Sequence, residues 1–123
     1  MQWWLVFLGG GLGAWLRYEL GGLAQARLGP SFPWGTFAVN AFGCLAIGLV
    51  ATWIDERGIA GPAWRTFLVA GVLGGFTTFS SFGLETFRLI EDGRVVAAAT
   101  NAGASVVVCV AAVAAGVVIG RSG

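Results

Sequence analysis

Long stretches without a charged side chain constrain this sequence more than any other feature. Residues 32–54, 66–84 and 95–120 contain no Asp, Glu, Lys or Arg, and an uncharged run over 1–16 is followed by Arg17 and Glu19. A helix needs about 20 apolar residues to cross the bilayer core. The sequence therefore predicts an all-α membrane protein with four transmembrane helices in a single domain over residues 1–123, the spans being about 2–25, 33–54, 63–90 and 95–120.

The scarcity of charge excludes several other classes of protein. Only 7 basic and 6 acidic side chains occur among 123 residues, 57% of the residues are hydrophobic, and the net charge is +1. A soluble domain has about a quarter of its residues charged. A nucleic-acid interface needs a basic patch, which this chain lacks. We therefore expect a lipid bilayer as the surroundings and no nucleic acid as a partner.

Metal and thiol signatures are also missing. The chain has no His, and its two cysteines, Cys44 and Cys109, lie far apart in apolar runs. These counts exclude the common zinc motifs. We expect each Cys to be a small buried apolar side chain.

Small residues recur one helical turn apart in the predicted spans. This spacing allows helix backbones to approach closely within lipid, so the spans are expected to pack together. The pairs are Gly9 with Gly13, Gly71 with Gly75, Ala99 with Gly103, and Gly116 with Gly120.

The arginines show no preferred side of the membrane. Orientation is normally set by an excess of Lys and Arg in cytoplasmic loops. In a four-span topology three arginines fall on the side of the termini and three on the other, and Arg17 stays within or at the edge of the first span. The balance predicts insertion in both orientations and pairing with an inverted copy, which is a dual-topology antiparallel homodimer. Orientation imposed by folding or by another subunit is the alternative.

The third span contains an unusual segment, residues 74–82, with the sequence GGFTTFSSF. Two glycines and adjacent β-branched threonines disfavour a helix, so we predict a break here. Broken backbone at membrane depth persists only where it is buried in protein or lines a wet cavity. Broken spans commonly form ion sites. A continuous glycine-rich packing helix, with its hydroxyls bonded to the preceding turn, is the alternative.

Two further spans carry polar residues in stripes. Asn40 lies mid-span between Thr36 and Cys44 at four-residue spacing, and Asn101 precedes Ser105 in the same way. Membrane asparagines often join helices. Beside a Ser/Thr-rich break, however, such stripes supply uncharged N–H and O–H donors, which suit a small anion better than a cation. Phenylalanine ring edges can add to these donors.

Three sequence blocks make the chain recognisable. They begin at Gly10, at Gly35 and at Gly74, and read GxxGAxxRY, GTxxVNxxG and GGFTTFSSFxxE. They resemble the signature blocks of the Fluc (CrcB) family of fluoride channels, in order and over a chain of comparable length. The resemblance implies no enzymatic activity. It implies a multi-pass protein of the cell inner membrane that passes fluoride passively and lowers its cytoplasmic level, through two pores at the interface of an antiparallel homodimer.

The same resemblance implies roles for individual residues. Phe79 and Phe82 fall in an aromatic box facing permeating fluoride, and Asn40 falls beside it as an amide donor. The family's pore hydroxyls match Thr78, Ser80 and Ser81, an acidic position beyond the box matches Glu85, and the fourth-span polar track aligns with Asn101 and Ser105. Arg17 falls at the aqueous vestibule. The backbone carbonyls of Gly74 and Thr77 fall where the family holds a structural sodium ion.

The sodium site has a physical argument besides the resemblance. Carbonyls freed by a mid-membrane break need a donor or a cation. The chain has no Lys or His, and we expect Arg17 near a span's end. An ion is therefore the remaining partner.

A proton-coupled exporter is the rival interpretation. Small multidrug transporters also have four short spans and dual topology, with a Glu in the middle of the first span. Here Glu19 lies near that span's end, beside Arg17. An enzymatic interpretation fares worse: residues 9–14 loosely fit the dinucleotide fingerprint, but Trp34 stands about where the fingerprint needs an acidic residue.

Overall fold

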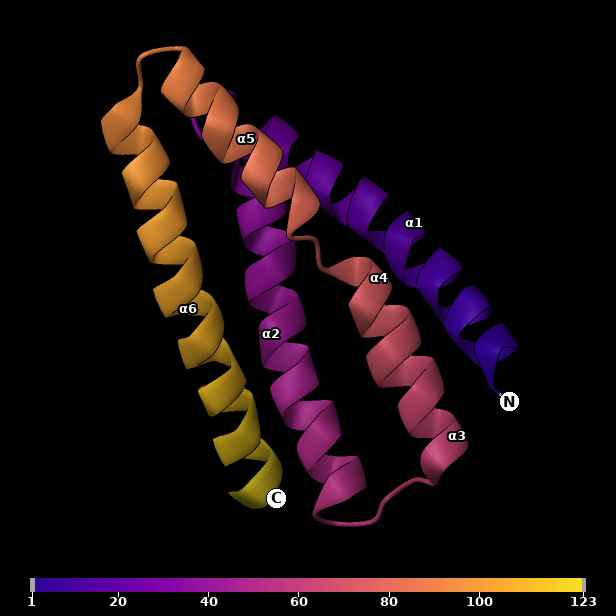
Figure 1. The fold of residues 1–123 in the computed structure, drawn as a ribbon. Helices are drawn as coiled ribbons and strands as arrows, with labels where there is room; N and C mark the ends of the chain where they lie inside the picture. Colours follow the sequence, from indigo (N-terminus) through magenta and orange to yellow (C-terminus); the bar gives the residue numbers. More distant parts are fainter. Residues whose placement is uncertain (1, 123) are drawn as a thin grey trace.

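The chain forms four helical passages that pack lengthwise (Figure 1). A computed structural model describes residues 2–122, and every regular element within them is a helix. Three passages are continuous and the third is divided, as predicted. The continuous helices are α1 (Trp3–Leu28), α2 (Trp34–Asp55) and α6 (Val95–Ser122), and the third passage consists of α3 (Pro62–Arg65), η1 (Thr66–Leu73), α4 (Gly74–Phe76) and α5 (Ser80–Glu91).

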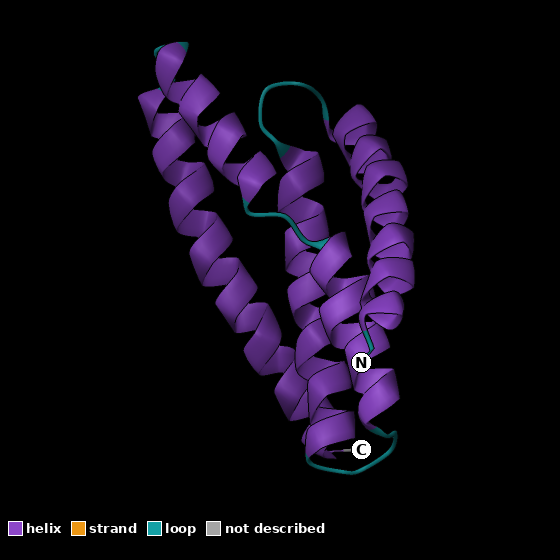
Figure 2. Ribbon diagram, turned by 45° about the vertical axis from the view of Figure 1, so that its right-hand side comes forward, coloured by secondary structure: helices purple, strands orange, loops and turns teal. Residues whose placement is uncertain are grey.

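The sequence did not predict the wide helix η1. It is a π-helix, in which the hydrogen bonds span one residue more than in an α-helix. Such turns are rare and frequently occur at functional sites. Here η1 leads directly into α4, and the break that follows is drawn as a loop between two helices in Figure 2.

Glycines bring α1 against the third passage. A Cβ added at Gly9 would lie 2.6 Å from the Phe67 carbonyl oxygen, and one at Gly13 would collide with the Val72 carbonyl. Gly75 faces the backbone of Gly10 in the same way. Two predicted small-residue pairs therefore form this contact, because only hydrogen at these positions leaves room for the facing backbone.

A second close contact joins α2 to α6, which run in the same direction (Figure 1). Added Cβ atoms would meet the Val113 carbonyl at Gly48 and the Leu45 carbonyl at Gly116. Gly120 approaches Thr52 nearby. The predicted pair of Ala99 and Gly103, by contrast, is exposed, and a Cβ at Gly103 would meet nothing within 4 Å.

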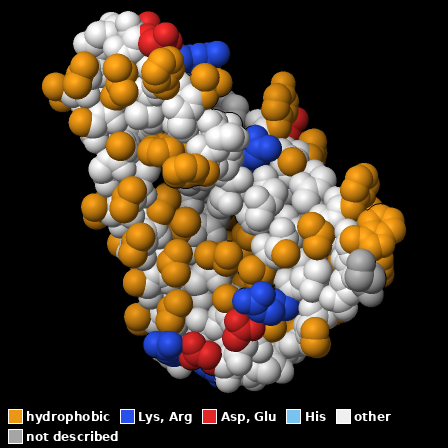
Figure 3. Space-filling model, in the orientation of Figure 1, with side chains coloured by type: hydrophobic (Ala, Val, Ile, Leu, Met, Phe, Trp, Pro, Cys, Tyr) orange, Lys and Arg blue, Asp and Glu red, His pale blue; other side chains and the backbone are white. Residues whose placement is uncertain are grey.

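Most apolar side chains lie on the outside of this chain. The buried hydrophobic residues among those described are only Val39, Phe76, Leu89 and Ala98, whereas many Trp, Phe, Leu and Val side chains are exposed over the bundle (Figure 3). Such a surface is stable facing lipid or another copy, but not facing water.

Three passages are long and apolar enough to cross a membrane on length and composition alone: Trp34–Asp55, Pro62–Glu91 and Val95–Ser122. Helix α1 matches them in length, but its apolar character is diluted where Arg17 and Glu19 lie. Crossing by α1 is therefore a prediction that rests on its packing along η1 and α4.

Charged side chains gather at the ends of the bundle. Both termini and the α2–α3 loop lie at one end (Figure 1). There Arg65 pairs with Asp55 and Arg121 with Glu56, each with an N–O distance of 2.8 Å. The hydrogen bond from Arg121 lowers the pKa of the Glu56 carboxyl. Pairs this exposed contribute little to the stability of the fold.

Candidate functional site

The break in the third passage lies at Thr77–Phe79, between α4 and α5. Thr77 has an extended backbone, with φ −92° and ψ 160°. The glycines are not the cause we predicted, because Gly74 and Gly75 are helical. Gly75 instead allows close packing against α1.

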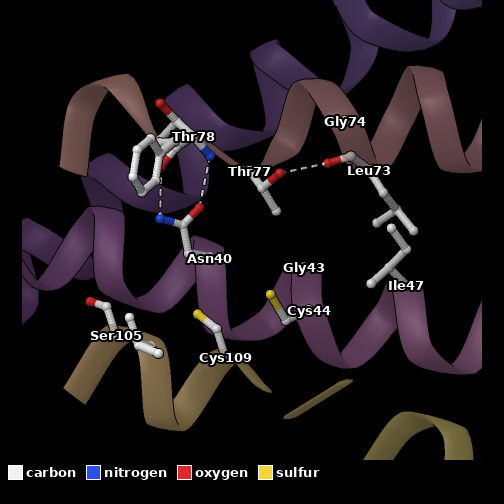
Figure 4. A pocket seen from close by; sticks show the side chains of 12 residues that line it. Asn40, Gly43, Cys44, Ile47, Leu73, Gly74, Thr77, Thr78, Ser105 and Cys109 are labelled. Carbon is white, nitrogen blue, oxygen red and sulfur yellow. Dashed lines mark hydrogen bonds between the residues drawn. The ribbon is translucent and has the colours of Figure 1, made fainter. Parts of the chain in front are cut away.

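The side chain of Asn40 holds the broken backbone in place. Its Nδ2 donates to the Thr78 carbonyl at 2.9 Å, and its Oδ1 accepts from the Thr78 N–H at 2.7 Å (Figure 4). One amide of α2 thus replaces both helical hydrogen bonds that Thr78 has lost. An amide nitrogen carries two hydrogens, so Asn40 keeps one further donor.

The hydroxyl groups of Thr77 and Thr78 form hydrogen bonds at the two helix ends that flank the break. The Thr78 hydroxyl accepts from the Ser81 N–H at 3.2 Å, which satisfies one N–H in the first turn of α5, and lies 3.4 Å from the exposed Ser80 hydroxyl. On the other side, the N–H and the hydroxyl of Thr77 both donate to the Leu73 carbonyl at 3.1 Å. The break is therefore a built feature with specific partners.

Arg17 reaches this region from α1. Its Nε donates to the Gly75 carbonyl at 3.1 Å. The prediction that the protein sends no internal cation to the break is therefore wrong for this carbonyl. Arg17 lies more than halfway along α1, which brings its guanidinium level with α4.

Other carbonyls at the break remain without donors. Among residues 2–122, no hydrogen bond is donated to the carbonyls of Gly74 or Thr77, and the same holds for Phe76. Unpaired carbonyls at membrane depth are costly. The two residues that the resemblance assigns to a cation thus carry oxygen atoms free to bind one.

Phe79 and Phe82 form an aromatic pair at the start of α5. Their ring centroids are 5.5 Å apart and their planes are tilted by 31°. Phe79 is 83% exposed, so its ring contributes little to packing within one chain. A large apolar ring in this position is available to a ligand or to a second copy.

A cavity of about 330 Å³ opens beside the break, between α2, α6 and the third passage. It brings together six of the predicted site residues with both cysteines (Figure 4). The predicted residues are Asn40, Gly74, Thr77, Thr78, Phe79 and Ser105.

A second, more polar cavity of about 170 Å³ lies between α1, α2 and α5. Arg17, Thr78, Ser81 and Glu85 line it. One carboxylate oxygen of Glu85 is buried and has no hydrogen-bond partner among the described residues. Thr78 borders both cavities, so the two adjoin the broken segment.

Asn101 lies outside both cavities. It is 2% exposed, and its Nδ2 donates to the Thr86 hydroxyl at 2.9 Å. That hydroxyl donates to the Phe82 carbonyl at 2.7 Å, and the Ser105 hydroxyl lies 3.4 Å from Asn101 Oδ1. Asn101 therefore connects α6 to α5 through the Thr86 hydroxyl and the Phe82 carbonyl.

Sequence reasoning missed several members of the site. Gln25 lines the second cavity beside Thr36, a member of the predicted polar stripe, and Thr86 links Asn101 to α5. The signal for Thr86 was Asn101 itself, because an amide in lipid needs a polar partner on a neighbouring helix. The expectation that the cysteines are buried is also wrong, since both are partly exposed at the first cavity.

Around the break, the site offers N–H and O–H hydrogen-bond donors, most of which carry no charge. The sequence of this chain is closely similar to those of known proteins. A family model described as "CrcB-like protein, Camphor Resistance (CrcB)" matches residues 4–117.

Curated relatives match over nearly the whole chain. A protein of Methylobacterium nodulans named "Fluoride-specific ion channel FluC" is 50% identical over 117 residues, covering 95% of this chain and 94% of that protein. One of Nitrobacter hamburgensis, named "Fluoride-specific ion channel FluC 2", is 44% identical and covers 98% of both chains. One of Rhizobium etli, named as the first, is 46% identical and covers 99% of this chain and 98% of that protein. These relatives are named as channels and not as enzymes. The chain is therefore a member of the CrcB family and a multi-pass membrane protein.

Proposed function

We propose that this protein is a fluoride-selective channel that passes the ion passively out of the cytoplasm across the cell inner membrane. The observation that carries the proposal is the near-full-length similarity to relatives named fluoride-specific ion channels, at 44% to 50% identity. The break held by Asn40 adds physical support, because it gathers uncharged donors beside two cavities.

The test is fluoride efflux from liposomes that contain only this purified protein. Efflux should occur without an applied proton gradient and should exceed that of protein-free liposomes. Flux that requires a proton gradient would support the exporter and overturn the channel. An absence of flux would overturn both.

In the proposed pore, fluoride passes the edges of Phe79 and Phe82. Ring edges carry the positive end of the aromatic quadrupole. The free amide hydrogen of Asn40 and the hydroxyls of Thr78, Ser80 and Ser81 replace water around the ion. Arg17 attracts anions at the vestibule, and Glu85 lies beyond the aromatic pair. Ser105 extends the polar path along α6, whereas Asn101 supports it from behind through Thr86.

Replacing either ring of the pair by isoleucine should impair fluoride flux. Phe79→Ile and Phe82→Ile keep much of the volume but remove the positive edge. Since Phe79 is largely exposed within one chain, folding should change little. The measurement is efflux from liposomes with dimer content checked by size-exclusion chromatography. Phe87→Ile, at another exposed ring of α5, is the matched control and should keep its flux. Normal flux in both pair variants would refute the assignment.

The functional unit in this proposal is a homodimer of inverted copies with two pores at the interface. The balanced arginines and the exposed apolar faces support it. Excluding Arg17 in the interior, three arginines lie toward each end of the bundle. By the bounds of the elements, these are Arg57, Arg65 and Arg121 at the end with the termini, and Arg27, Arg88 and Arg94 toward the other.

Dual topology makes a direct prediction about labelling in cells. A tag at one terminus should be reached from outside in about half of the molecules, because no arginine excess favours either orientation. Adding two or three Arg to one loop should shift this fraction strongly. Labelling from one side only would contradict the inverted dimer.

We further propose that the Gly74 and Thr77 carbonyls of both copies hold a structural sodium ion on the dimer axis. Four carbonyl oxygens suit a small, hard cation. The unpaired state of these carbonyls supports the assignment. The ion offsets the cost of leaving the carbonyls unpaired and need not permeate.

Removal of sodium should therefore abolish fluoride flux without any change in sequence. Efflux is measured after purification in a large organic cation, and sodium is then restored. Flux should return with sodium, and no sodium current should accompany it. Full flux in the absence of sodium, or measurable sodium permeation, would disprove the structural role.

A further inference from the structure

The two cysteines of the chain are 65 positions apart in sequence but meet at one cavity. Cys44 on α2 and Cys109 on α6 both line the cavity of about 330 Å³, and both are partly exposed. Figure 4 shows both side chains at this cavity, between the facing helices α2 and α6. Neither is used in the proposed fluoride pathway.

Packing of the helix backbones explains why the thiols meet. Gly48 faces the Val113 carbonyl where α2 and α6 touch. Cys44 precedes Gly48 by one helical turn, and Cys109 precedes Val113 by one turn. Because the helices run in the same direction, both side chains reach the same level of the interface. The close contact of the two helices thus places Cys44 and Cys109 at the same cavity.

We propose that Cys44 and Cys109 form a two-thiol binding site for a soft divalent metal ion of the mercury(II) class. Thiolates are the side chains that soft metals select. With mercuric chloride, both S–H bonds break and two S–Hg bonds form, and two protons and two chloride ions are released. No change of oxidation state is needed.

The surroundings favour this class of ion over others. Two thiolates and one divalent ion form a neutral complex, which avoids the cost of a charge in an apolar interior. A monovalent soft ion would leave one negative charge. Zinc requires four ligands, and residues 2–122 contain no group of three His, Cys, Asp or Glu side chains that could hold a metal. Mercury(II), in contrast, is satisfied by two sulfur atoms in a linear arrangement.

The site has a consequence for transport that rests on the proposed function. Asn40, Thr78 and Phe79 line the same cavity as the two thiols. A metal bridging the cysteines therefore occupies the space next to the aromatic pair. Bound mercury should block fluoride flux.

Binding is tested on the purified full-length protein with mercuric chloride. The wild-type protein should bind one mercury per chain and retain it during dialysis against a monothiol, as measured by elemental analysis. Cys44→Ala and Cys109→Ala each leave a single S–Hg bond, so both variants should lose mercury in that dialysis. Equal loss from the wild type and the single variants would overturn the site, as would failure of the native protein to bind mercury that the unfolded chain takes up.

The transport arm separates this proposal from the channel proposal. Mercury should reduce wild-type fluoride efflux to the level of protein-free liposomes, whereas the double variant Cys44→Ala with Cys109→Ala should keep its flux. If mercury inhibited fluoride efflux by the wild type and by the double variant equally, the inhibition would not act through the thiols. Retained mercury in a protein that never conducts fluoride would refute the channel and leave the metal site standing.

Discussion

Asn40→Leu should abolish fluoride flux and destabilise the fold. The substitution keeps a similar volume but removes the amide that bonds the carbonyl and the N–H of Thr78. Each buried backbone group left without a partner costs about 1 to 3 kcal/mol. With both groups unmet, we expect a loss of at least about 2 kcal/mol and a break that no longer holds one geometry. Unfolding in detergent micelles, followed by tryptophan fluorescence, gives the stability change, and liposome efflux gives the flux.

A control on the same helix separates this effect from general loss of polarity. Thr52→Val replaces a buried residue by one of similar shape, and Thr52 is not among the described residues with a buried side-chain atom left without a partner. It should leave both stability and flux close to wild type. If Asn40→Leu behaved like Thr52→Val, Asn40 would not be holding the break.

Gly13→Ala should have the largest effect on packing. A Cβ at this position would collide with the Val72 carbonyl and lie 2.9 Å from the Phe76 nitrogen. Both obstacles are backbone atoms, which cannot rotate away as a side chain can. Helix α1 must therefore move off the third passage, at a cost of about 1 to 3 kcal/mol for this overpacking. The shift would also withdraw Arg17 from the Gly75 carbonyl, so fluoride flux should fall together with stability.

Gly11→Ala is the matched control two residues away on the same helix. A Cβ there would meet nothing within 4 Å. Alanine is favoured over glycine in a helix by about 1 kcal/mol, so this variant should be as stable as wild type or more stable. The measurement is the free energy of unfolding of both variants in the same detergent. Equal stability of the two proteins would show that α1 does not pack closely against the third passage at Gly13.

Local patterns in the sequence sufficed for the helices and for the family. Uncharged runs predicted the four passages because lipid tolerates few charges, and this constraint acts on each segment separately. The motifs around Arg17, Asn40 and Phe79 identified the family, which the close relatives confirm. The break was located to within a few residues. The glycine part of its predicted cause was wrong, because Gly75 is helical and packs against Gly10, which is distant in sequence. The break itself falls at the predicted threonines, Thr77 and Thr78.

Only the tertiary structure decided which partners the polar groups take. Asn40 was recognisable as a mid-membrane amide, but its attachment to both backbone groups of Thr78 depends on how α2 lies against the break. The same holds for Arg17 at Gly75 and for Asn101 at Thr86. Cys44 and Cys109 appeared unrelated in sequence and meet because glycines let α2 and α6 touch. Composition and periodicity determine which segments enter the membrane, since burial in lipid is a property of one helix. Hydrogen bonds between helices depend on the relative placement of the two helices, and that is fixed by packing alone.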